Sequence, residues 1–460
     1  MKKQIIFSTA LAIFLTACSS SSLQVNSHYE LPKNLENAAF LKVDKFWWQH
    51  FEEEDLNSLV NQMLDNNSDM LMALQKIEQA KLYLDNANAS FFPSIDASVN
   101  SSSNKKREKG ESYTSSKSTS ATISMNYELD LWGKVRASHN IAQAALNMTQ
   151  YDFETIQLSL VATLVETYFQ YTATCEKIKL TRYTIQNEEK VLTIMKKKHE
   201  LGTINALDLG RQKSSLLTYE STLTALELQK KSLHSSLALL VGKSSQELHI
   251  EEPSFEKIII PKVSENLSST LLLNRPDVAR AKEQIKSNNA SVHAAYASLF
   301  PSFNLTAQAG QASASLLSLN HPTTTLGLGL GLNLNLFDRD ILKNQVKIEQ
   351  SKTYESVENY KKTVLTALKE VEDALNSSHS NKIQNELKEA ILKEENKTLS
   401  LSQLQYDYGV IDFSLLMDAK KANTQAKESL INQKLLYLYS LVTLQKALSG
   451  SWVEEEEKER

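Results

Sequence analysis

Two segments of the chain alternate strictly between apolar and polar residues. From Ile123 to Leu131, every second residue is apolar, and from Leu326 to Leu336 six leucines alternate with glycine and asparagine. A period of two is typical of a β-strand with one apolar face. Shorter alternating runs follow Pro93 and Pro301. Each half of the chain is therefore predicted to contain a pair of strands.

Very long helices are predicted after each strand pair. Neither glycine nor proline occurs between Gly133 and Gly202, or between Gly331 and Gly409. Helices of roughly 60 to 70 residues would be about 90 to 105 Å long. Apolar residues three and four positions apart indicate helices packed as coiled coils. One such stripe contains Val357, Tyr360, Val364, Ala367, Val371 and Ala374, and another runs from Leu216 to Leu240 with Lys230 as its exception.

The same landmarks occur twice, which indicates an internal duplication. For example, Phe92-Pro93-Ser94 returns as Phe300-Pro301-Ser302. The predicted organisation is repeat 1 over residues 55–252, a linker over 253–275 and repeat 2 over 276–450. The expected elements are shorter helices over about 55–89 and 276–297, strand pairs over 94–131 and 302–337, long helices over 137–201 and 341–408, and further helices over 205–241 and 412–448. Ser101 to Thr119 is expected to be a flexible extracellular loop. Its basic run Lys105-Lys106-Arg107 is interpreted as solvated surface, with a lipid-headgroup contact as the alternative.

The N-terminus is typical of a bacterial lipoprotein. Residues 1–17 have the basic start and apolar core of a signal peptide, and Leu15 to Cys18 is similar to a lipobox. Cys18 is then the lipidated first residue of the mature chain, held at a bilayer by its acyl groups. The alternative is an ordinary signal peptide with an incidental cysteine. Cys175 lies on an apolar helical stripe and is predicted to be a buried thiol.

Composition restricts the possible partners. A net charge of −4 gives no nucleic-acid signature, and residues 451–460 form an acidic tail. Nothing beyond the N-terminus reaches the apolar length of a membrane helix, but strands of about ten residues can cross a bilayer at a tilt. A soluble antiparallel sheet is the alternative. Nine scattered histidines suggest no metal site, and no Gly-x-Ser-x-Gly or phosphate loop suggests an enzyme.

If the strands cross lipid, several chains must share one barrel. Four strands cannot close, and an open edge leaves backbone groups without partners in hydrocarbon. Two chains give a barrel of eight strands, and side chains can fill the interior of such a barrel. Three chains give a barrel of twelve strands. An aqueous conduit favours three or more chains.

Glycine turns are predicted at the far ends of the long helices. Gly202 and Gly409 lie where a helix ends in a left-handed residue. Asn205 and Asp412 follow three residues later as N-caps of the next helices. Asp208 falls in the first turn of the helix that follows Asn205. A negative charge is stabilised there by the helix dipole, which alone could explain an aspartate at this position. Three copies of Asp418 could form an acidic ring, with an ordinary solvated aspartate as the alternative.

Five short motifs occur in order along the chain. They are Phe46-Trp47-Trp48, Leu129-Asp130-Leu131-Trp132-Gly133, Asn274-Arg275-Pro276-Asp277, Ser298-Leu299-Phe300-Pro301 and Leu416-Met417-Asp418-Ala419. Together they resemble the TolC/OprM-type outer-membrane efflux proteins, specifically their lipoprotein (NodT-like) branch. The resemblance implies a mainly α protein with four membrane β-strands per protomer. Three protomers would share a twelve-stranded barrel and a long coiled-coil α-helical barrel. Residues 18–54 and 253–275 would form an equatorial region.

The resemblance also implies roles for residues at the hairpins. Asp418, Asp208 and Lys421 match the periplasmic gate, although Leu415 replaces a second gate aspartate of some members. An adaptor would dock at the turns marked by Gly202, Asn205, Gly409 and Asp412. The implied partners are outer-membrane lipid, a periplasmic membrane-fusion adaptor and an inner-membrane pump of the proton-driven RND type. No cofactor is expected apart from the lipid on Cys18.

These features predict a passive exit duct of a tripartite efflux system in the bacterial outer membrane. One alternative is an outer-membrane duct for type I protein secretion. Another is a lipid-anchored periplasmic adaptor or scaffold, which would usually contain only one long helical hairpin. The identity of the substrate does not follow from the residues.

Overall fold

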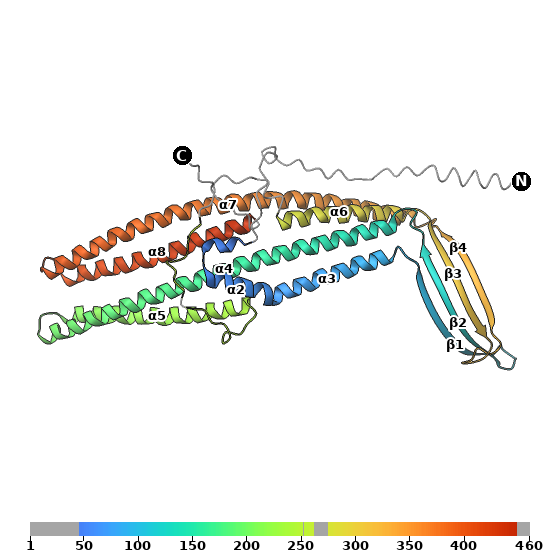
Figure 1. Ribbon diagram of the computed structural model, residues 1–460, viewed down its shortest axis with the longest axis horizontal. Helices are drawn as coiled ribbons and strands as arrows, with labels where there is room; N and C mark the ends of the chain where they lie inside the picture. The colour runs from blue at the N-terminus through green and yellow to red at the C-terminus, as the bar shows by residue number, and fades with distance from the viewer. Residues whose placement is uncertain (1–45, 252, 262–274, 449–460) are drawn as a thin grey trace. The chain divides into compact units, whose positions relative to one another are not determined.

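The computed structural model describes residues 46–251, 253–261 and 275–448. The signal peptide, Cys18 and the acidic tail lie outside these residues, as does most of the predicted linker. The elements, labelled as in Figure 1, are η2 (Trp47–Phe51), α2 (Glu54–Asn66), α3 (Ser68–Ala89), β1 (Ser94–Lys106), β2 (Thr114–Glu128), α4 (Lys134–Glu200), α5 (Ala206–Leu240), α6 (Pro276–Ala297), β3 (Ser302–Ser313), β4 (Thr323–Asn333), α7 (Arg339–Asp407) and α8 (Phe413–Ala447). At 1.5 Å per residue, α4 and α7 are each about 100 Å long.

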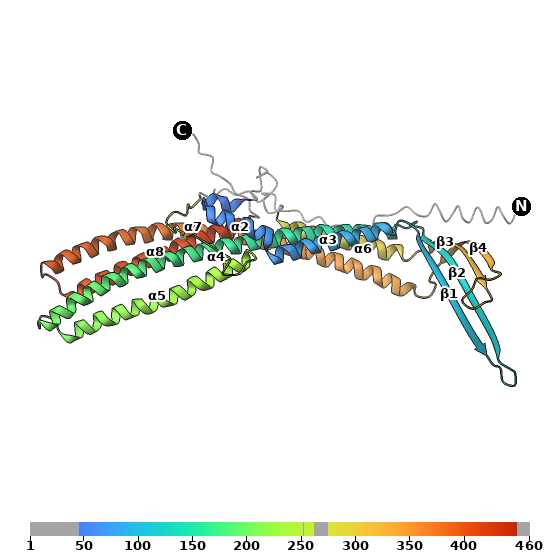
Figure 2. The same ribbon diagram turned by 60° about the horizontal axis from the view of Figure 1, so that its bottom comes forward.

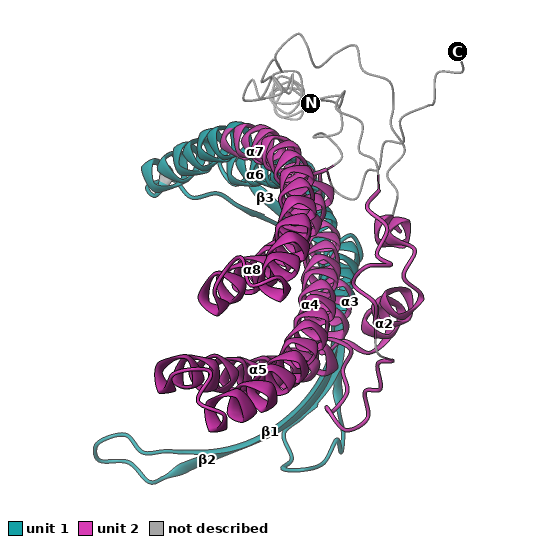
Figure 3. Cartoon of the chain, turned by 90° about the vertical axis from the view of Figure 1, so that its left-hand side faces the viewer, with its two compact units in different colours: residues 1–29, 78–148, 281–361 teal, residues 30–77, 149–280, 362–460 magenta. Residues whose placement is uncertain are grey.

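The chain forms two compact units, coloured separately in Figure 3. Within the described residues, unit 1 contains 78–148 and 281–361. Unit 2 contains 46–77, 149–280 and 362–448, apart from the gaps given above. Each unit takes residues from both sequence repeats, so a repeat is not a separate compact body.

Unit 1 contains one antiparallel sheet in the order β1-β2-β3-β4 (Figures 1 and 2). The central pairing of β2 with β3 joins the two repeats. One row of neighbours across the sheet is Ile95, Met125, Ala307 and Leu328. The adjacent row, on the other face, is Ser94, Asn126, Thr306 and Gly329. The predicted alternation is therefore confirmed, because one face of the sheet is apolar and the other is small or polar.

The first strand pair is longer than its sequence indicates. Pairing of β1 with β2 continues to Lys106 and Thr114, so most of the expected loop over 101–119 is strand, and that expectation was wrong. Hydroxyl groups replace apolar contacts in this part of the hairpin. The Ser101 and Thr119 hydroxyls lie 2.9 Å apart. Because these cross-strand pairs are polar, the sequence of this part of the hairpin has no alternation of apolar residues that would predict a strand.

The sequence pattern predicted that Asp130 lies on the second strand, but the structure places it after the end of that strand. β2 ends at Glu128, and the Asp130 carboxylate accepts hydrogen bonds from the backbone amides of Val135 at 2.9 Å and Arg136 at 3.1 Å. It therefore binds amides at the start of α4 that have no partner within the helix. These bonds lower the pKa of Asp130 and outweigh its partial burial, which acts in the opposite direction.

Unit 2 contains two helical hairpins, α4 beside α5 and α7 beside α8 (Figures 1 and 2). Its main apolar core brings together η2, α2 and the middle of α4 with α5 and α8. The rings of Phe51 and Phe169 pack edge to face, with centroids 4.9 Å apart. Cys175 belongs to this core, which confirms its predicted burial. Among the described helices, none is both long and apolar enough to cross a membrane.

The predicted helix over 55–89 is two helices. Asn67 has an extended backbone and separates α2 from α3. Its side-chain oxygen accepts hydrogen bonds from the amides of Asp69 and Met70, and its side-chain nitrogen donates to the Leu240 carbonyl at 2.8 Å. Asn67 thus caps α3 and ties it to the end of α5, a long-range contact that local sequence does not reveal. The other predicted helices agree with the structure to within three residues at each end.

Candidate functional site

The ends of the two helical hairpins have the same backbone design. Gly202 and Gly409 have φ values of +70° and +73°, which confirms the predicted left-handed turns. At the first turn, the Thr203 amide donates to the Lys198 carbonyl at 2.9 Å, and at the second the Val410 amide donates to the Gln405 carbonyl at 2.8 Å. These bonds are those of a Schellman motif, in which glycine avoids the steric penalty of a side chain.

Both following helices begin at the predicted N-caps. The Asn205 side chain accepts a hydrogen bond from the Asp208 amide at 2.8 Å. The Asp412 side chain accepts one from the Leu415 amide at 3.0 Å and another from the Ser414 hydroxyl. These bonds favour the carboxylate form and lower the pKa of Asp412. The turns are therefore fixed by local hydrogen bonds on both sides.

A groove of about 670 Å³ lies between α5 and α8, close to these turns. It contains all three residues predicted for the gate, Asp208, Asp418 and Lys421. We call it the α5–α8 groove. Its other charged residues are Glu188, Arg211, Lys420 and Glu428. The predicted docking residues Gly202, Asn205, Gly409 and Asp412 do not line the groove but form the adjacent turns.

The wall of the α5–α8 groove contains a buried polar contact that the sequence did not reveal. Gln212 of α5 donates from its side-chain nitrogen to the Glu188 carbonyl at 3.0 Å and to the Glu188 carboxylate at 2.7 Å. Only 1% of Gln212 and 5% of Glu188 is exposed. Burial, followed by the charge of Glu188, raises the pKa of the nearby Tyr219 hydroxyl. Gln212 lies between Arg211 and Lys213 in the sequence, so its neighbours did not indicate that it is buried.

Similar polar contacts join the helices of the second hairpin. Asn423 of α8 donates to Asn396 of α7 at 2.7 Å, and Gln433 donates to Asn381 at 3.0 Å. Polar pairs between packed helices are a known way to fix their register. In each of these pairs the α8 residue is buried.

The two hairpins also contact each other near their ends. The Lys198 ammonium group of α4 lies 5.5 Å from the ring centroid of Tyr406 and donates to its hydroxyl at 3.3 Å. Lys230, the exception in the apolar stripe of α5, similarly lies over the Tyr171 ring at 5.8 Å. A cation held over an aromatic face is stabilised electrostatically. The ring of Tyr171 therefore provides a partner for the one lysine in the apolar stripe of α5.

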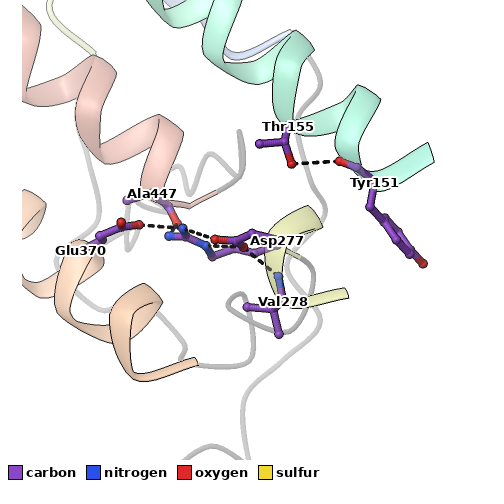
Figure 4. A network of polar contacts seen from close by, with 7 residues as sticks. Tyr151, Thr155, Asp277, Val278, Glu370 and Ala447 are labelled. Atoms are coloured by element: carbon purple, nitrogen blue, oxygen red, sulfur yellow. Dashed lines mark hydrogen bonds and ion pairs between the residues drawn. The ribbon is translucent and has the colours of Figure 1, made fainter. Parts of the chain in front are cut away.

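A second polar cluster surrounds Arg275, at the start of α6 (Figure 4). Its guanidinium group donates to Asp277 at 2.8 Å, to Glu370 of α7 at 2.6 Å and to the carbonyl of Ala447 at 3.0 Å. The sequence motif identified Arg275 and Asp277, but the partners on α7 and α8 follow only from the fold. The cluster connects three helices of unit 2.

The α5–α8 groove is lined by charged and polar side chains. The carboxylates and ammonium groups of the α5–α8 groove can attract ions or polar partners through their charge. The predicted residues are thus gathered in one region, where their geometry is suited to binding or to controlling passage.

Comparisons with family models, related sequences and solved structures all indicate the same protein family. The family model described as "Outer membrane efflux protein" matches residues 59–243 and 267–450. The chain is 28% identical to the pyoverdine export outer membrane protein OpmQ of Pseudomonas aeruginosa, across 96% of this chain and 95% of that protein. It is 24% identical to the cation efflux system protein CusC of Escherichia coli O157:H7, across 96% and 97%.

The fold is also that of a solved channel. The structure of the Campylobacter jejuni CmeC outer membrane channel aligns with a TM-score of 0.82 and 23% identity, across 95% of this chain and 96% of that one. These findings confirm the resemblance inferred from the sequence motifs. The chain belongs to the outer membrane efflux protein family.

Proposed function

We propose that this outer membrane efflux protein is a passive exit duct built from three identical chains. The observation that carries the proposal is the open sheet of unit 1. Neither β1 nor β4 pairs with another described strand on its outer edge. Leu326, Leu328 and Leu330 of the β4 edge are 81%, 80% and 67% exposed. A flat apolar edge of this kind would aggregate in water, whereas lipid can cover the leucines and another chain can pair with the edge.

Closure of the sheet sets the number of chains. Each chain supplies four strands, so two chains would form eight and three would form twelve. An eight-stranded barrel has room inside only for side chains, and a wider one leaves an aqueous channel. A water-filled duct therefore favours three or more chains, and the family resemblance implies three. The apolar row containing Ile95 and Leu328 would face lipid. The row containing Ser94 and Gly329 would face the lumen.

The hairpin ends supply the proposed gate and docking surface. Asp208, Asp418 and Lys421 line one groove, so their charges would act together on ions near the entrance. The exposed turns at Gly202, Asn205, Gly409 and Asp412 would receive a periplasmic adaptor, which connects the duct to an inner-membrane pump. A proton-driven RND pump is the proposed source of energy. Lipid attachment at Cys18 would add an anchor in the outer membrane.

The relatives support a duct that does not itself select the cargo. One is a pyoverdine export protein, another belongs to a cation efflux system and a third to a toluene efflux pump. Similar chains thus serve cargoes of unrelated chemistry, which favours selection by the pump. The same argument keeps a duct for type I protein secretion as the second candidate. Membership of the family argues against a periplasmic adaptor or scaffold.

The test is conductance in planar bilayers. The purified full-length chain should insert and give stepwise currents of one unit size, because a twelve-stranded barrel encloses water. A preparation that binds detergent but never conducts would overturn the proposed duct. The fold of the helical hairpins would be unaffected by that result.

A further inference from the structure

The first hairpin of the sheet extends beyond the other strands as a two-stranded arm. Pairing of β2 with β3 stops at Thr119 and Ser313, whereas pairing of β1 with β2 continues to Lys106 and Thr114. We call residues 102–118 the basic arm. It contains five basic and two acidic side chains, in a chain whose net charge is −4. The other hairpin turn, residues 314–322, contains no acidic residue, lysine or arginine.

The strand register assigns the lysines of the basic arm to particular faces. Counting outward from the apolar pair Val99 and Ala121, the next pairs on the same face are Ser101 with Thr119, Ser103 with Lys117, and Lys105 with Ser115. Lys105 and Lys117 are thus diagonal neighbours on the apolar face of the sheet. Lys106 lies on the opposite face.

Lys105 and Lys117 are the two basic residues on the paired strands of the arm that have no partner; Lys109, which also has none among the described residues, lies in the turn and not on a strand. Lys106 forms an ion pair with Glu108 at 2.8 Å, and the Arg107 guanidinium lies 5.2 Å from the ring centroid of Tyr113. Lys105 and Lys117 are exposed, and neither forms an ion pair or hydrogen bond with any described residue. Two like charges on adjacent strands repel each other unless an anion lies between them.

Their position along the strands matches the region just outside a hydrocarbon layer. At about 3.3 Å per residue, Lys105 lies about 36 Å along β1 from Ser94, and Lys117 lies about 36 Å along β2 from Glu128. For strands tilted by about 45°, both lysines lie about 26 Å above these strand ends, and the apolar band of a membrane barrel is about 25 Å tall. Headgroups lie immediately beyond that band. Lysines at that height, on the lipid-facing side, complement phosphate groups.

We propose that Lys105 and Lys117 form a phosphate-binding site for the glycolipid of the outer leaflet. This inference rests on the proposed function, because the sheet must cross the outer membrane with the arm outside. The two ammonium groups would bind a lipid phosphate on the outer surface of the barrel. The charge would fix the height and rotation of the sheet in the bilayer without entering the lumen.

The test is binding of purified diphosphoryl lipid A to the detergent-solubilised full-length protein. The double substitution Lys105→Ser and Lys117→Ser should weaken binding roughly five- to twentyfold, and added salt should reduce that difference. Lys106→Ser is the matched control, since it removes a neighbouring charge from the opposite face, and it should bind as the wild type does. Fully dephosphorylated lipid A should bind wild type and double variant equally.

Three results would overturn the inference. The double variant could bind lipid A as tightly as the wild type, Lys106→Ser could weaken binding equally, or inorganic phosphate could bind as well as lipid A does. Conductance in neutral planar bilayers separates this failure from that of the proposed function. Variants that conduct normally while binding lipid A unchanged would remove only the glycolipid site. A wild type that never conducts would remove the duct and, with it, the basis for the site.

Discussion

Arg275 donates a hydrogen bond of 3.0 Å to the carbonyl oxygen of Ala447, which connects the start of α6 to the last residue of α8. The final carbonyls of a helix have no partner within that helix. Arg275 supplies one while also binding Asp277 and Glu370, and only 8% of Arg275 is exposed. This single side chain therefore stabilises the junction where both elements meet α7.

Replacing Arg275 should destabilise unit 2. Arg275→Ala removes charge-assisted hydrogen bonds and leaves the Ala447 carbonyl unsatisfied, so we expect a loss of about 2 kcal/mol in the free energy of unfolding. The temperature at which the purified protein loses its helical circular dichroism measures the effect.

Arg280→Ala is the matched control. Arg280 lies on the same helix and binds Asp152 at 2.6 Å, but both side chains are nearly half exposed. Solvent-exposed pairs contribute about 0–1 kcal/mol, so this substitution should have little effect. Equal destabilisation by the two substitutions would contradict the structural role assigned to Arg275.

The N-cap of α5 should control local fraying at the first hairpin end. Asn205→Ala removes the acceptor for the Asp208 amide and should cost about 1 kcal/mol. Hydrogen exchange of the amides at the start of α5 should become faster. Asn205→Asp restores an acceptor and should return exchange toward the wild-type rate. If the alanine variant exchanges as slowly as the wild type, the cap does not hold this turn.

The junction between β2 and α4 should weaken in acid. The pKa of Asp130 lies below its usual value of 3.8, because the amides of Val135 and Arg136 favour the carboxylate. Above pH 3.8 the carboxylate is ionised in both states, and its stabilisation is fully present. As the pH falls below 3.8, the carboxyl group is protonated in the unfolded chain before it is protonated in the folded chain. The stabilisation therefore decreases, and it is lost as the pH falls through the pKa of the folded chain.

Asp130→Asn provides the comparison for this pH dependence. Hydrogen exchange of the Val135 amide, corrected for its intrinsic pH dependence, should rise between about pH 4 and pH 2 in the wild type. In the asparagine variant, the exchange rate of the same amide, corrected in the same way, should not rise over this pH range. A wild-type junction equally protected at both pH values would show that Asp130 does not stabilise it.

Asp418 should attract cations to the entrance of the proposed duct. Asp418→Ala should reduce block by divalent cations, because it removes a carboxylate that would bind them at the entrance. Relief of this block should raise single-channel conductance. Asp407→Ala is a suitable control, since Asp407 ends α7 near the turn but does not line the α5–α8 groove. Unchanged conductance and block in the Asp418 variant would reject the gate assignment.

Features governed by neighbouring residues were predictable from the sequence. The left-handed glycines and the N-caps at Asn205 and Asp412 depend on backbone geometry within a few residues. The apolar face of β4 follows from strict alternation of leucine and glycine. The buried stripe containing Val364 and Ala367 follows from heptad spacing. In each case one physical rule, steric or hydrophobic, decides the conformation.

Features that depend on distant partners were not predictable. The outer half of the first hairpin is serine-rich, and its pairing relies on hydroxyl contacts such as that between Ser101 and Thr119. The contact of Gln212 with Glu188 joins residues on two helices, and polar residues there show no periodicity. The grouping of Asp208 with Asp418 in one groove did not follow from residue spacing, because the two lie in different repeats; only the family resemblance predicted it.

The number of chains in the purified particle tests the central claim most directly. Native mass spectrometry of the full-length protein, released from detergent, should give three copies and no stable smaller species. Three copies are expected because three chains of four strands are the smallest number that leaves an aqueous channel, and the family resemblance implies a trimer. A particle of one or two copies, or a chain that stays monodisperse in water without detergent, would contradict the account.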